Sequence, residues 1–288
     1  MYIFRAVFKL LLLDSAELAL FTGRLVKSLI MTLKGFEPLR RFYEGFGLKP
    51  FRATPLLHCS TGALVRGRVE AGEALCFEVS YASQDISGVQ SLASVDEDVK
   101  VFSSRARVEA KNIEIVTADT LTIGFRNPQD QVIKIIFETP TLLSVKLMTP
   151  PVPEIQKRLA KARTLYMLFP SPAHICSYLV KLWNTAFPTT PLVPLYSPEW
   201  APYLFGRLCE ATMAPIDYSI KPTTIAYDER RRIRGFTGWT IIDTTPIGRK
   251  HIERIDKLMA LANYLGLGKS RGIGFGKVRA TAIERKRS

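Results

Sequence analysis

The spacing of apolar and polar positions along this chain predicts a first series of strands and helices. Residues 2–12, YIFRAVFKLLL, predict a strand, and Asp14 or Ser15 is expected to cap a helix that runs to about Leu33. A short helix is expected within 84–98. Strand-like segments follow one another from Phe51 to about Phe137: LVRGRVEAG, ALCFEVSYA, VKVFSSRARVEAKNIEIV and TLTIGF.

A second series begins after NPQD at 127–130, which is a turn signal. VIKIIFET predicts a strand, and 153–168 predicts a helix whose Ile155, Leu159, Ala162 and Leu165 face inward. Helix is also expected around 173–187, and TTIAYDERRRIRGFTGWTII predicts two strands that flank a charged bend. The closing helix repeats apolar residues at helical spacing: Ile252, Ile255, Leu258, Met259, Ala262 and Leu265.

Each half of the chain therefore follows the order strand, helix, strand, strand, helix, strand. This order is that of the ferredoxin-like βαββαβ unit. We expect an α+β fold of two tandem ferredoxin-like domains, residues 1–128 and 129–288, with the glycine-rich loop in the second. The sequence has no obvious internal repeat, so the duplication rests on element order alone.

A glycine-rich segment, GLGKSRGIGFGKV, spans Gly266 to Val278. Glycine permits positive φ and close approach of a ligand, and Lys269, Arg271 and Lys277 add charge beside the main-chain amides. Dinucleotide and P-loop motifs follow a strand and open a helix, whereas this loop follows a helix and precedes a strand. The segment predicts a site for a phosphate backbone and disfavours a mononucleotide site; the alternative is a flexible turn.

Charge and cysteine content narrow the function further. The 288 residues carry 40 Lys and Arg against 26 Asp and Glu, a net charge of +14, which favours a polyanionic partner or an acidic membrane surface. No apolar run is long enough for a membrane helix, and the N-terminal run Leu10–Leu13 is followed by Asp14, so no membrane partner is expected. The cysteines, Cys59, Cys76, Cys176 and Cys209, are far apart in sequence and predict small core residues in a reducing cytosol, without a zinc site or disulfide framework.

Two basic groups stand out. Arg24, Lys27 and Lys34 recur on one stripe of the first helix, and the charged bend contains Arg230, Arg231, Arg232 and Arg234. A solvated helix face and a soluble hairpin tip are the simplest interpretations. Arginine nevertheless suits phosphate, because its planar fork donates two parallel hydrogen bonds.

The combined features resemble the CRISPR-associated repeat-processing endoribonucleases of the RAMP superfamily. The matching glycines are Gly266, Gly268, Gly272, Gly274 and Gly276. Supporting stretches are FTGRLVKSLI, KPFRATPLL at Lys49 to Leu57, FETPTLL at Phe137 to Leu143 and RGFTGWTI at Arg234 to Ile241. The resemblance spans nearly the whole chain.

The resemblance implies a cytoplasmic enzyme that binds CRISPR repeat RNA and cuts the precursor transcript into guide RNAs. In such enzymes the upstream 2′-hydroxyl attacks the phosphorus and leaves a cyclic phosphate and a 5′-hydroxyl. The reaction needs a base, an acid and positive charge, with no metal and no cofactor. The sequence shows no cluster of Asp, Glu or His at metal-ligand spacing.

The resemblance also implies site residues, and this chain departs from the family pattern at one of them. Many members place a histidine between the first helix and the second strand, but residues 35–52 contain Tyr43, Lys49 and Arg52 and no histidine. Lys27 and Lys49 match the lysines on which other members rely, and Arg24 is the expected phosphate clamp; His58 stays an open alternative. His174 and His251 are expected to be structural or surface residues. The expected RNA-binding residues are Arg52, Arg230, Arg231, Arg232, Arg234, Gly266, Gly268, Lys269, Arg271, Gly272, Gly274 and Gly276.

Two other functions remain open at this point. A non-catalytic RAMP subunit would bind guide RNA beside other subunits of a CRISPR effector complex and use the same loop for grip. A general RNA chaperone or adaptor would bind without repeat preference and with strong salt dependence. The sequence does not decide whether the protein is a homodimer, whether the processed guide RNA stays bound, or which cation acts as the base.

Overall fold

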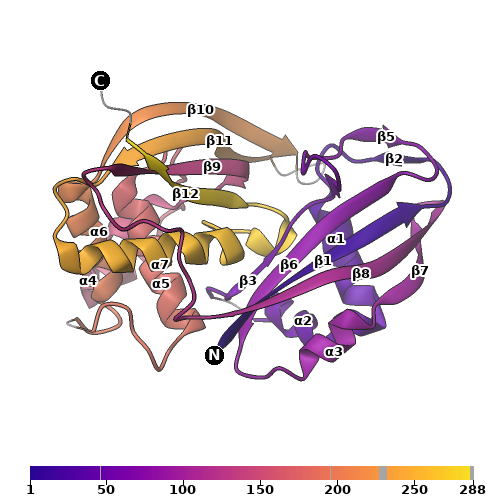
Figure 1. The fold of residues 1–288 in the computed structure, drawn as a ribbon, viewed down its shortest axis with the longest axis horizontal. Helices are drawn as coiled ribbons and strands as arrows, with labels where there is room; N and C mark the ends of the chain where they lie inside the picture. Colours follow the sequence, from indigo (N-terminus) through magenta and orange to yellow (C-terminus); the bar gives the residue numbers. More distant parts are fainter. Residues whose placement is uncertain (46, 195, 227–231, 286–288) are drawn as a thin grey trace. The chain divides into compact units, whose positions relative to one another are not determined.

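The computed structural model describes residues 1–45, 47–194, 196–226 and 232–285 (Figure 1). These form two compact units. Unit 1 comprises Met1–Thr117 and Ser270–Phe275, and unit 2 comprises Ala118–Lys269 and Gly276–Ser288. The middle of the glycine-rich segment therefore belongs to unit 1. The domain boundary expected after residue 128 stays a prediction.

The main sheet of unit 1 has six strands. Five follow the order β3-β6-β1-β8-β7, and β4 also pairs with β6. Two further strands, β2 and β5, form a small separate sheet. The strands are β1 Tyr2–Leu12, β2 Ala16–Leu18, β3 Phe51–Ala53, β4 Leu57–His58, β5 Gly67–Val69, β6 Ala74–Ser83, β7 Asp96–Val101 and β8 Ser104–Thr117.

The helices of unit 1 complete a ferredoxin-like order. In chain order β1, α1, β3, β6, α3 and β8 give strand, helix, strand, strand, helix, strand, and the four strands lie in the order second, third, first, fourth. β7 is an added edge strand. The helices are α1 Gly23–Thr32, η1 Lys34–Phe36, α2 Glu37–Arg40, η2 Arg41–Tyr43, α3 Gly88–Ala93 and η4 Arg271–Ile273.

Unit 2 has the same arrangement. Its sheet has the order β10-β11-β9-β12, again second, third, first, fourth. The long helices α5 and α7 lie against one face of this sheet (Figure 1). The elements are β9 Gln131–Thr141, η3 Val145–Met148, α4 Pro153–Lys161, α5 Pro172–Ala186, α6 Ala201–Thr212, β10 Ala214–Ala226, β11 Arg232–Asp243, α7 Arg249–Leu265 and β12 Val278–Glu284. The predicted tandem ferredoxin-like α+β fold is confirmed.

Strong periodicity predicted individual elements well. β1 buries every second residue from Phe4 to Leu12, as an alternating strand with one core face should. In α7 all the apolar residues named from spacing are buried. Gly266 follows the helix with φ +74, the positive φ expected of a glycine that ends a helix.

The predicted start of the first helix is wrong. Residues Ala16–Leu18 are instead a strand that pairs with Gly67–Val69, so the chain is still extended there. The helix begins at Gly23, and the Thr22 carbonyl accepts the first helical hydrogen bond from Val26. Pairing with a strand about fifty residues further along the chain decides where the helix begins, and the local spacing of apolar residues does not reveal this pairing.

Two other segments also differ from their predictions. TLTIGF is not a strand: Ile123 and Phe125 donate their amides to the carboxylate of Asp256 at 3.1 and 2.8 Å. The helix α4 ends at Lys161 and has no buried residue, so its expected inward face is wrong. The helix α6 was not predicted, because proline and aromatic residues obscure the periodicity around it.

The cysteine prediction is partly wrong. Cys59 and Cys76 form a disulfide with a Cα–Cα separation of 5.0 Å, between the end of β4 and β6. Cys176 and Cys209 are free and buried, as small core residues are. Sequence separation alone could not pair Cys59 with Cys76, because the pairing of β4 with β6 brings them together.

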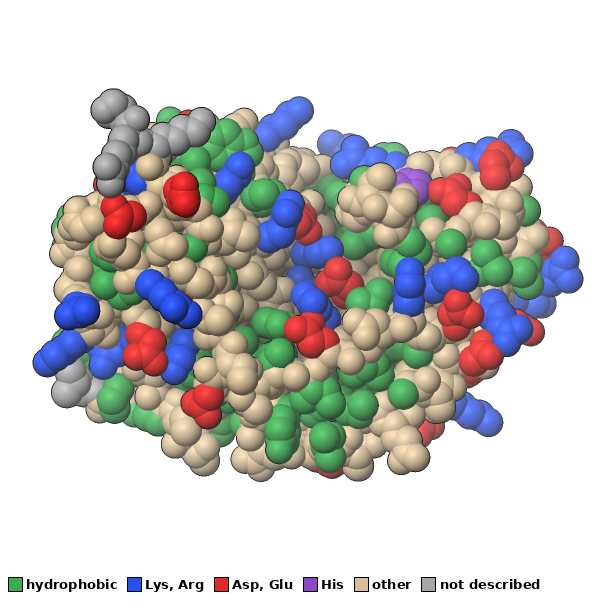
Figure 2. Space-filling view, viewed as in Figure 1, with side chains coloured by type: hydrophobic (Ala, Val, Ile, Leu, Met, Phe, Trp, Pro, Cys, Tyr) green, Lys and Arg blue, Asp and Glu red, His purple; other side chains and the backbone are tan. Residues whose placement is uncertain are grey.

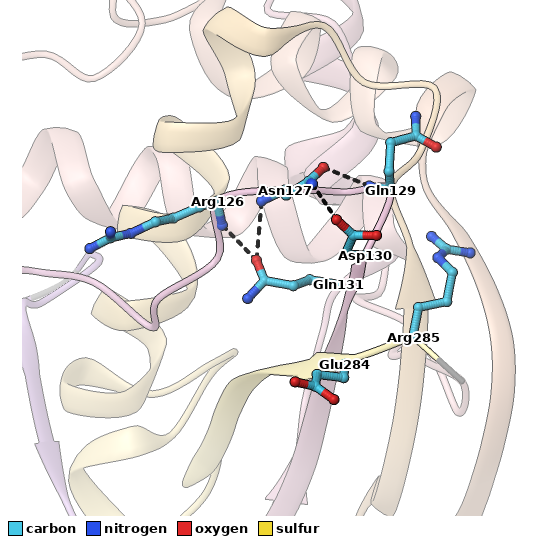
Figure 3. Close-up of a pocket in the computed structure, with 7 residues that line it drawn as sticks. All are labelled: Arg126, Asn127, Gln129, Asp130, Gln131, Glu284 and Arg285. Atoms are coloured by element: carbon cyan, nitrogen blue, oxygen red, sulfur yellow. Dashed lines mark hydrogen bonds between the residues drawn. The ribbon is translucent and has the colours of Figure 1, made fainter. Parts of the chain in front are cut away.

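The turn before β9 lines an open hollow of about 460 Å³ at the end of the unit 2 sheet (Figure 3). Gln131 accepts the amides of Arg126 and Asn127 at 2.8 and 3.1 Å, and Asn127 donates to Asp130 at 2.6 Å. These side chains thus stabilise the turn itself. In the part of the chain that the structure describes, no helix is long and apolar enough to cross a membrane.

An ion pair fixes the last residue described. Arg285 donates to Asp243 at 2.7 Å, and Thr245 donates to the same carboxylate at 2.6 Å. The hydrogen bond from Arg285 is the main reason that the pKa of Asp243 lies well below its ordinary value.

Because the folded-state pKa of Asp243 is depressed, its contribution to stability is present above the unfolded pKa near ~4 and is lost as pH falls. We expect Arg285→Gln to lower the free energy of unfolding by about 1–2 kcal/mol at pH 7 and by progressively less below about pH 4. Urea unfolding of wild type and Arg285→Gln at several pH values from about 7 to below about 4 measures the loss at neutral pH and its decrease at low pH. The control is Arg279→Gln on β12, the strand just before Arg285; the Arg279 side chain in its ion pair with Glu138 is more exposed, so its loss should matter less. A gap between Arg285→Gln and wild type that does not change with pH would contradict the assignment.

Candidate active site and RNA-binding surface

Two of the residues singled out in the first half meet in unit 1. Lys27 lies on α1 and is half-buried, and its Nζ is 5.2 Å from the centroid of the Tyr43 ring. Tyr43 comes from η2, after the chain has turned through η1 and α2. An aromatic face attracts a cation, so the ring fixes the position of the lysine ammonium group.

Tyr43 is itself held by the glycine-rich segment. Its hydroxyl donates to the carbonyl of Gly272 at 2.6 Å, and its ring packs edge-on against Phe51 with centroids 5.2 Å apart. Burial raises the pKa of Tyr43 above its ordinary value, so the phenol stays protonated at neutral pH. Tyr43 is therefore suited to positioning Lys27.

Lys49, the second expected catalytic lysine, lies in the same region of unit 1. Its carbonyl accepts a hydrogen bond from Arg271, and its Nζ is 3.5 Å from the position that a side chain on Gly45 would occupy. Gly45 is only two residues beyond Tyr43. Lys27, Tyr43 and Lys49 thus come from α1, η2 and the segment before β3, and we call them the lysine cluster.

Several main-chain amides of the glycine-rich segment are hydrogen-bonded within the protein. The amides of Gly266, Gly274 and Gly276 donate to the carbonyls of Ala262, Arg271 and Pro140. These three amides are therefore not available as phosphate donors, and RNA contact by the three glycines stays a prediction. RNA contact by Gly268 and Gly272 stays a prediction.

The glycines serve close packing instead. Gly272 lies against Tyr43 and Phe51, and Gly274, with φ +93, against Pro55 and Phe21. In unit 2, the carbonyl of Gly268 accepts a hydrogen bond from Tyr178 at 2.7 Å. The glycines of this segment therefore have a packing role, and its middle, Ser270–Phe275, is part of unit 1.

Two arginines expected to bind RNA are buried. Arg52 is 1% exposed and pairs with Glu78 at 2.9 Å, and Arg271 is 5% exposed and donates to the carbonyl of Lys49. A buried guanidinium group cannot reach a phosphate at the surface. The prediction that these two arginines contact RNA is therefore wrong, and both stabilise unit 1.

Other expected cations are on the surface, and Figure 2 shows lysine and arginine side chains across the face that it views. Arg24 on α1, Arg232 and Arg234 on β11, and Lys269 at the glycine-rich segment are exposed. Arg230 and Arg231 lie outside the described residues. RNA contact by Arg232, Arg234 and Lys269 and phosphate binding by Arg24 stay predictions.

The histidines are engaged elsewhere. His58 on β4 pairs with Glu73 at 3.0 Å, next to the Cys59–Cys76 disulfide. In unit 2, His174 contacts the Ser171 hydroxyl at 3.2 Å and His251 contacts Arg254 at 3.2 Å; burial lowers the pKa of both. Among residues 1–45, 47–194, 196–226 and 232–285, no three His, Cys, Asp or Glu are grouped to hold a metal ion.

The residue that sequence reasoning left without a role is Tyr43. The signal was the resemblance, whose members often have a tyrosine in the segment between the first helix and the second strand, and Tyr43 lies in that segment. Its contacts with Lys27 and Gly272 depend on the fold, because the three residues are distant in the sequence.

Two ferredoxin-like units and a glycine-rich segment before the last strand define a RAMP-type protein. Residues 135–278 match the family model described as CRISPR-associated endoribonuclease Cas6, and the chain belongs to this family. Two curated relatives come from Saccharolobus solfataricus. The chain is 27% identical to CRISPR-associated endoribonuclease Cas6 1 over 224 residues, 76% of this chain and 73% of the relative. It is 28% identical to Cas6 2 over 266 residues, 90% and 85% of the two chains.

Solved structures have the same fold. A Cas6 product complex has a TM-score of 0.67 at 17% identity and covers 96% of this chain and 99% of its own. Thermus thermophilus Cas6 has a TM-score of 0.63 at 16% identity, with 96% and 98% covered. At this identity the likeness concerns the fold.

A pair of glycine substitutions tests the structural role of the segment. Gly268 and Gly124 both have positive φ, +84 and +78, but a Cβ at Gly268 would lie 2.5 Å from the Leu142 carbonyl oxygen, whereas Gly124 has nothing within 4 Å. We expect Gly124→Ala to lower the free energy of unfolding by about 1 kcal/mol and Gly268→Ala by clearly more, since it adds a clash. Urea unfolding measures the difference. Equal losses would contradict the tight packing of Gly268.

Proposed function

We propose that the protein cleaves CRISPR repeat RNA by attack of the upstream 2′-hydroxyl on the scissile phosphate, without a metal ion. The observation that carries the proposal is the lysine cluster, in which Tyr43 contacts Lys27 and also Phe51, two residues after Lys49. Membership of the Cas6 endoribonuclease family supports RNA as the substrate. The solved Cas6 complexes with product and with a substrate mimic agree with this class of ligand.

The reaction exchanges one phosphodiester bond for another. A base removes the proton of the 2′-hydroxyl, the 2′-oxygen forms a bond to phosphorus, and the bond from phosphorus to the 5′-oxygen breaks. The departing oxygen takes up a proton, so the products are a 2′,3′-cyclic phosphate and a 5′-hydroxyl. Charge builds up on the phosphorane oxygens, and a fixed cation stabilises this transition state more than the substrate.

The lysine cluster provides such cations. Lys27 is held over the Tyr43 ring, and Tyr43 is anchored to Gly272, so the ammonium group needs little reorganisation when the phosphorane forms. An ammonium group can also donate the proton that the 5′-oxygen needs. We assign both roles to Lys27 and Lys49 together, with exposed Arg24 on α1 as the phosphate clamp.

Single-turnover cleavage of the host's CRISPR repeat RNA in EDTA tests the proposal. We expect one cut with a cyclic phosphate end, and no cut when the nucleotide before the scissile phosphate lacks its 2′-hydroxyl. Lys27→Ala should slow cleavage by about 10²–10³-fold while weakening RNA affinity much less, because its charge acts mainly in the transition state. Lys49→Ala should behave in the same way.

Lys34→Ala is the matched control, since Lys34 is an exposed lysine just after α1. Its cleavage rate should stay near that of wild type. Bound but uncut repeat RNA would contradict the enzyme and favour a non-catalytic RAMP subunit. Cleavage that stops in EDTA would contradict the metal-independent mechanism alone.

A further inference from the structure

The helix α4 of unit 2 is unusual in its exposure. It contains no buried residue, and Ile155 at its start is 38% exposed. Lys157, Arg158 and Lys161 are exposed and recur at three- and four-residue spacing, so they share one side of the helix. Packing against a hydrophobic core therefore does not explain the position of this helix.

Hydrogen bonds fix α4 on the surface. The Nζ of Lys146 donates to the carbonyls of Leu159 and Ala162 at 2.5 Å each, which satisfies the C-terminal end of the helix. Gln156 donates to the carbonyl of Pro150 at 3.0 Å near the other end. Hydrogen bonds at both ends thus hold α4 in its exposed position.

The chain after α4 is paired with the segment that holds the glycine loop. Tyr166 forms an antiparallel bridge with Ser144, and Leu142 forms a parallel bridge with Gly268. Lys269 donates its amide to the Leu142 carbonyl at 3.0 Å, and its Nζ lies 5.8 Å from the centroid of the Tyr166 ring. These bridges connect α4 to Lys269 within unit 2. We call Lys157, Arg158, Lys161, Arg163, Tyr166 and Lys269 the α4 strip.

The charge of this region is not balanced. Residues 144–169 carry five cations and one acid, Glu154, a net charge of +4. Within the described part of the chain, none of the cations of the α4 strip forms an ion pair, whereas Arg105 and Arg107 of unit 1 pair with Asp14 and Asp96.

Apolar and aromatic side chains lie among these cations. Val145 is 43% exposed and Leu165 is 59% exposed, and the amide of Val145 donates to the carbonyl of Leu165 at 3.1 Å. Tyr166 is half-buried beside them. Single-stranded RNA needs both kinds of surface, since its phosphates bind cations and its unpaired bases stack on rings and apolar groups. A duplex offers mainly phosphates and hydroxyls.

We propose that the α4 strip binds unpaired RNA of the transcript, separately from the lysine cluster that cuts it. The inference rests on the proposed function for the identity of the RNA. Lys157, Arg158, Lys161 and Arg163 contact phosphates, and Tyr166 stacks on a base while Lys269 contacts the neighbouring phosphate.

Fluorescence anisotropy with oligouridylate of about 12 nucleotides, and with an RNA hairpin of similar phosphate number, tests the proposal on the full chain. We expect the triple variant K157Q/R158Q/K161Q to bind oligouridylate about 10-fold or more weakly, with the slope of log affinity against log salt reduced by about 2. Tyr166→Ala should weaken oligouridylate binding about 5-fold or more and hairpin binding less, and Tyr166→Phe should retain it.

The matched control is R66Q/K100Q/K111Q, which removes the same charge from exposed positions of unit 1 and should have a smaller effect. Unchanged oligouridylate affinity in K157Q/R158Q/K161Q would overturn the inference. Equal losses for Tyr166→Ala on both RNAs would overturn the stacking role. If K157Q/R158Q/K161Q instead lost binding to phosphatidylglycerol vesicles alone, the strip would be a membrane surface.

Cleavage of the repeat RNA by wild type separates this inference from the proposed function. If wild type cuts the repeat RNA and K157Q/R158Q/K161Q binds oligouridylate normally, only the α4 strip is contradicted. If wild type binds oligouridylate through the strip but does not cut repeat RNA, only the proposed function is contradicted.

Discussion

The lysine cluster depends on one close approach, between the start of α1 and the tip of the glycine-rich segment. A Cβ at Gly23 would lie 1.9 Å from the carbonyl oxygen of Ile273, so only glycine permits this contact. Gly272, the residue before Ile273, is thereby held where its carbonyl accepts a hydrogen bond from the Tyr43 hydroxyl. The ring of Tyr43 in turn makes a cation–π contact with the ammonium group of Lys27. The glycines therefore fix the residues of the lysine cluster, where we propose that the RNA is cut.

The chain uses its cations in two ways. Arg52 and Arg271 are buried and stabilise unit 1 through Glu78 and the Lys49 carbonyl. The cations of α4 are exposed and lack ion pairs within the described residues. Net charge alone cannot distinguish these uses, because a buried arginine and an exposed one count equally. The ligand is expected where exposed positive charge and apolar side chains coincide.

The regular elements could be predicted from the sequence because their signals are local. Alternation identified β1, and helical spacing with Gly266 identified α7 and its end. The Cys59–Cys76 disulfide, the strand Ala16–Leu18 and the contact of Tyr43 with Gly272 could not be predicted, since each joins segments distant along the chain. Arg52 illustrates the same limit for the site. The resemblance implied that it binds RNA, but pairing of β3 with β6 buries it against Glu78.

A structure of the full chain with repeat RNA that lacks the 2′-hydroxyl at the cut tests the central claim most directly, because the uncut phosphate then marks the site. We expect that phosphate to lie within about 3 Å of the ammonium nitrogen of Lys27 or Lys49. The amides of Gly266, Gly274 and Gly276 should still donate to protein carbonyls, as they do without RNA. A scissile phosphate bound by those glycine amides and distant from both lysines would contradict the account.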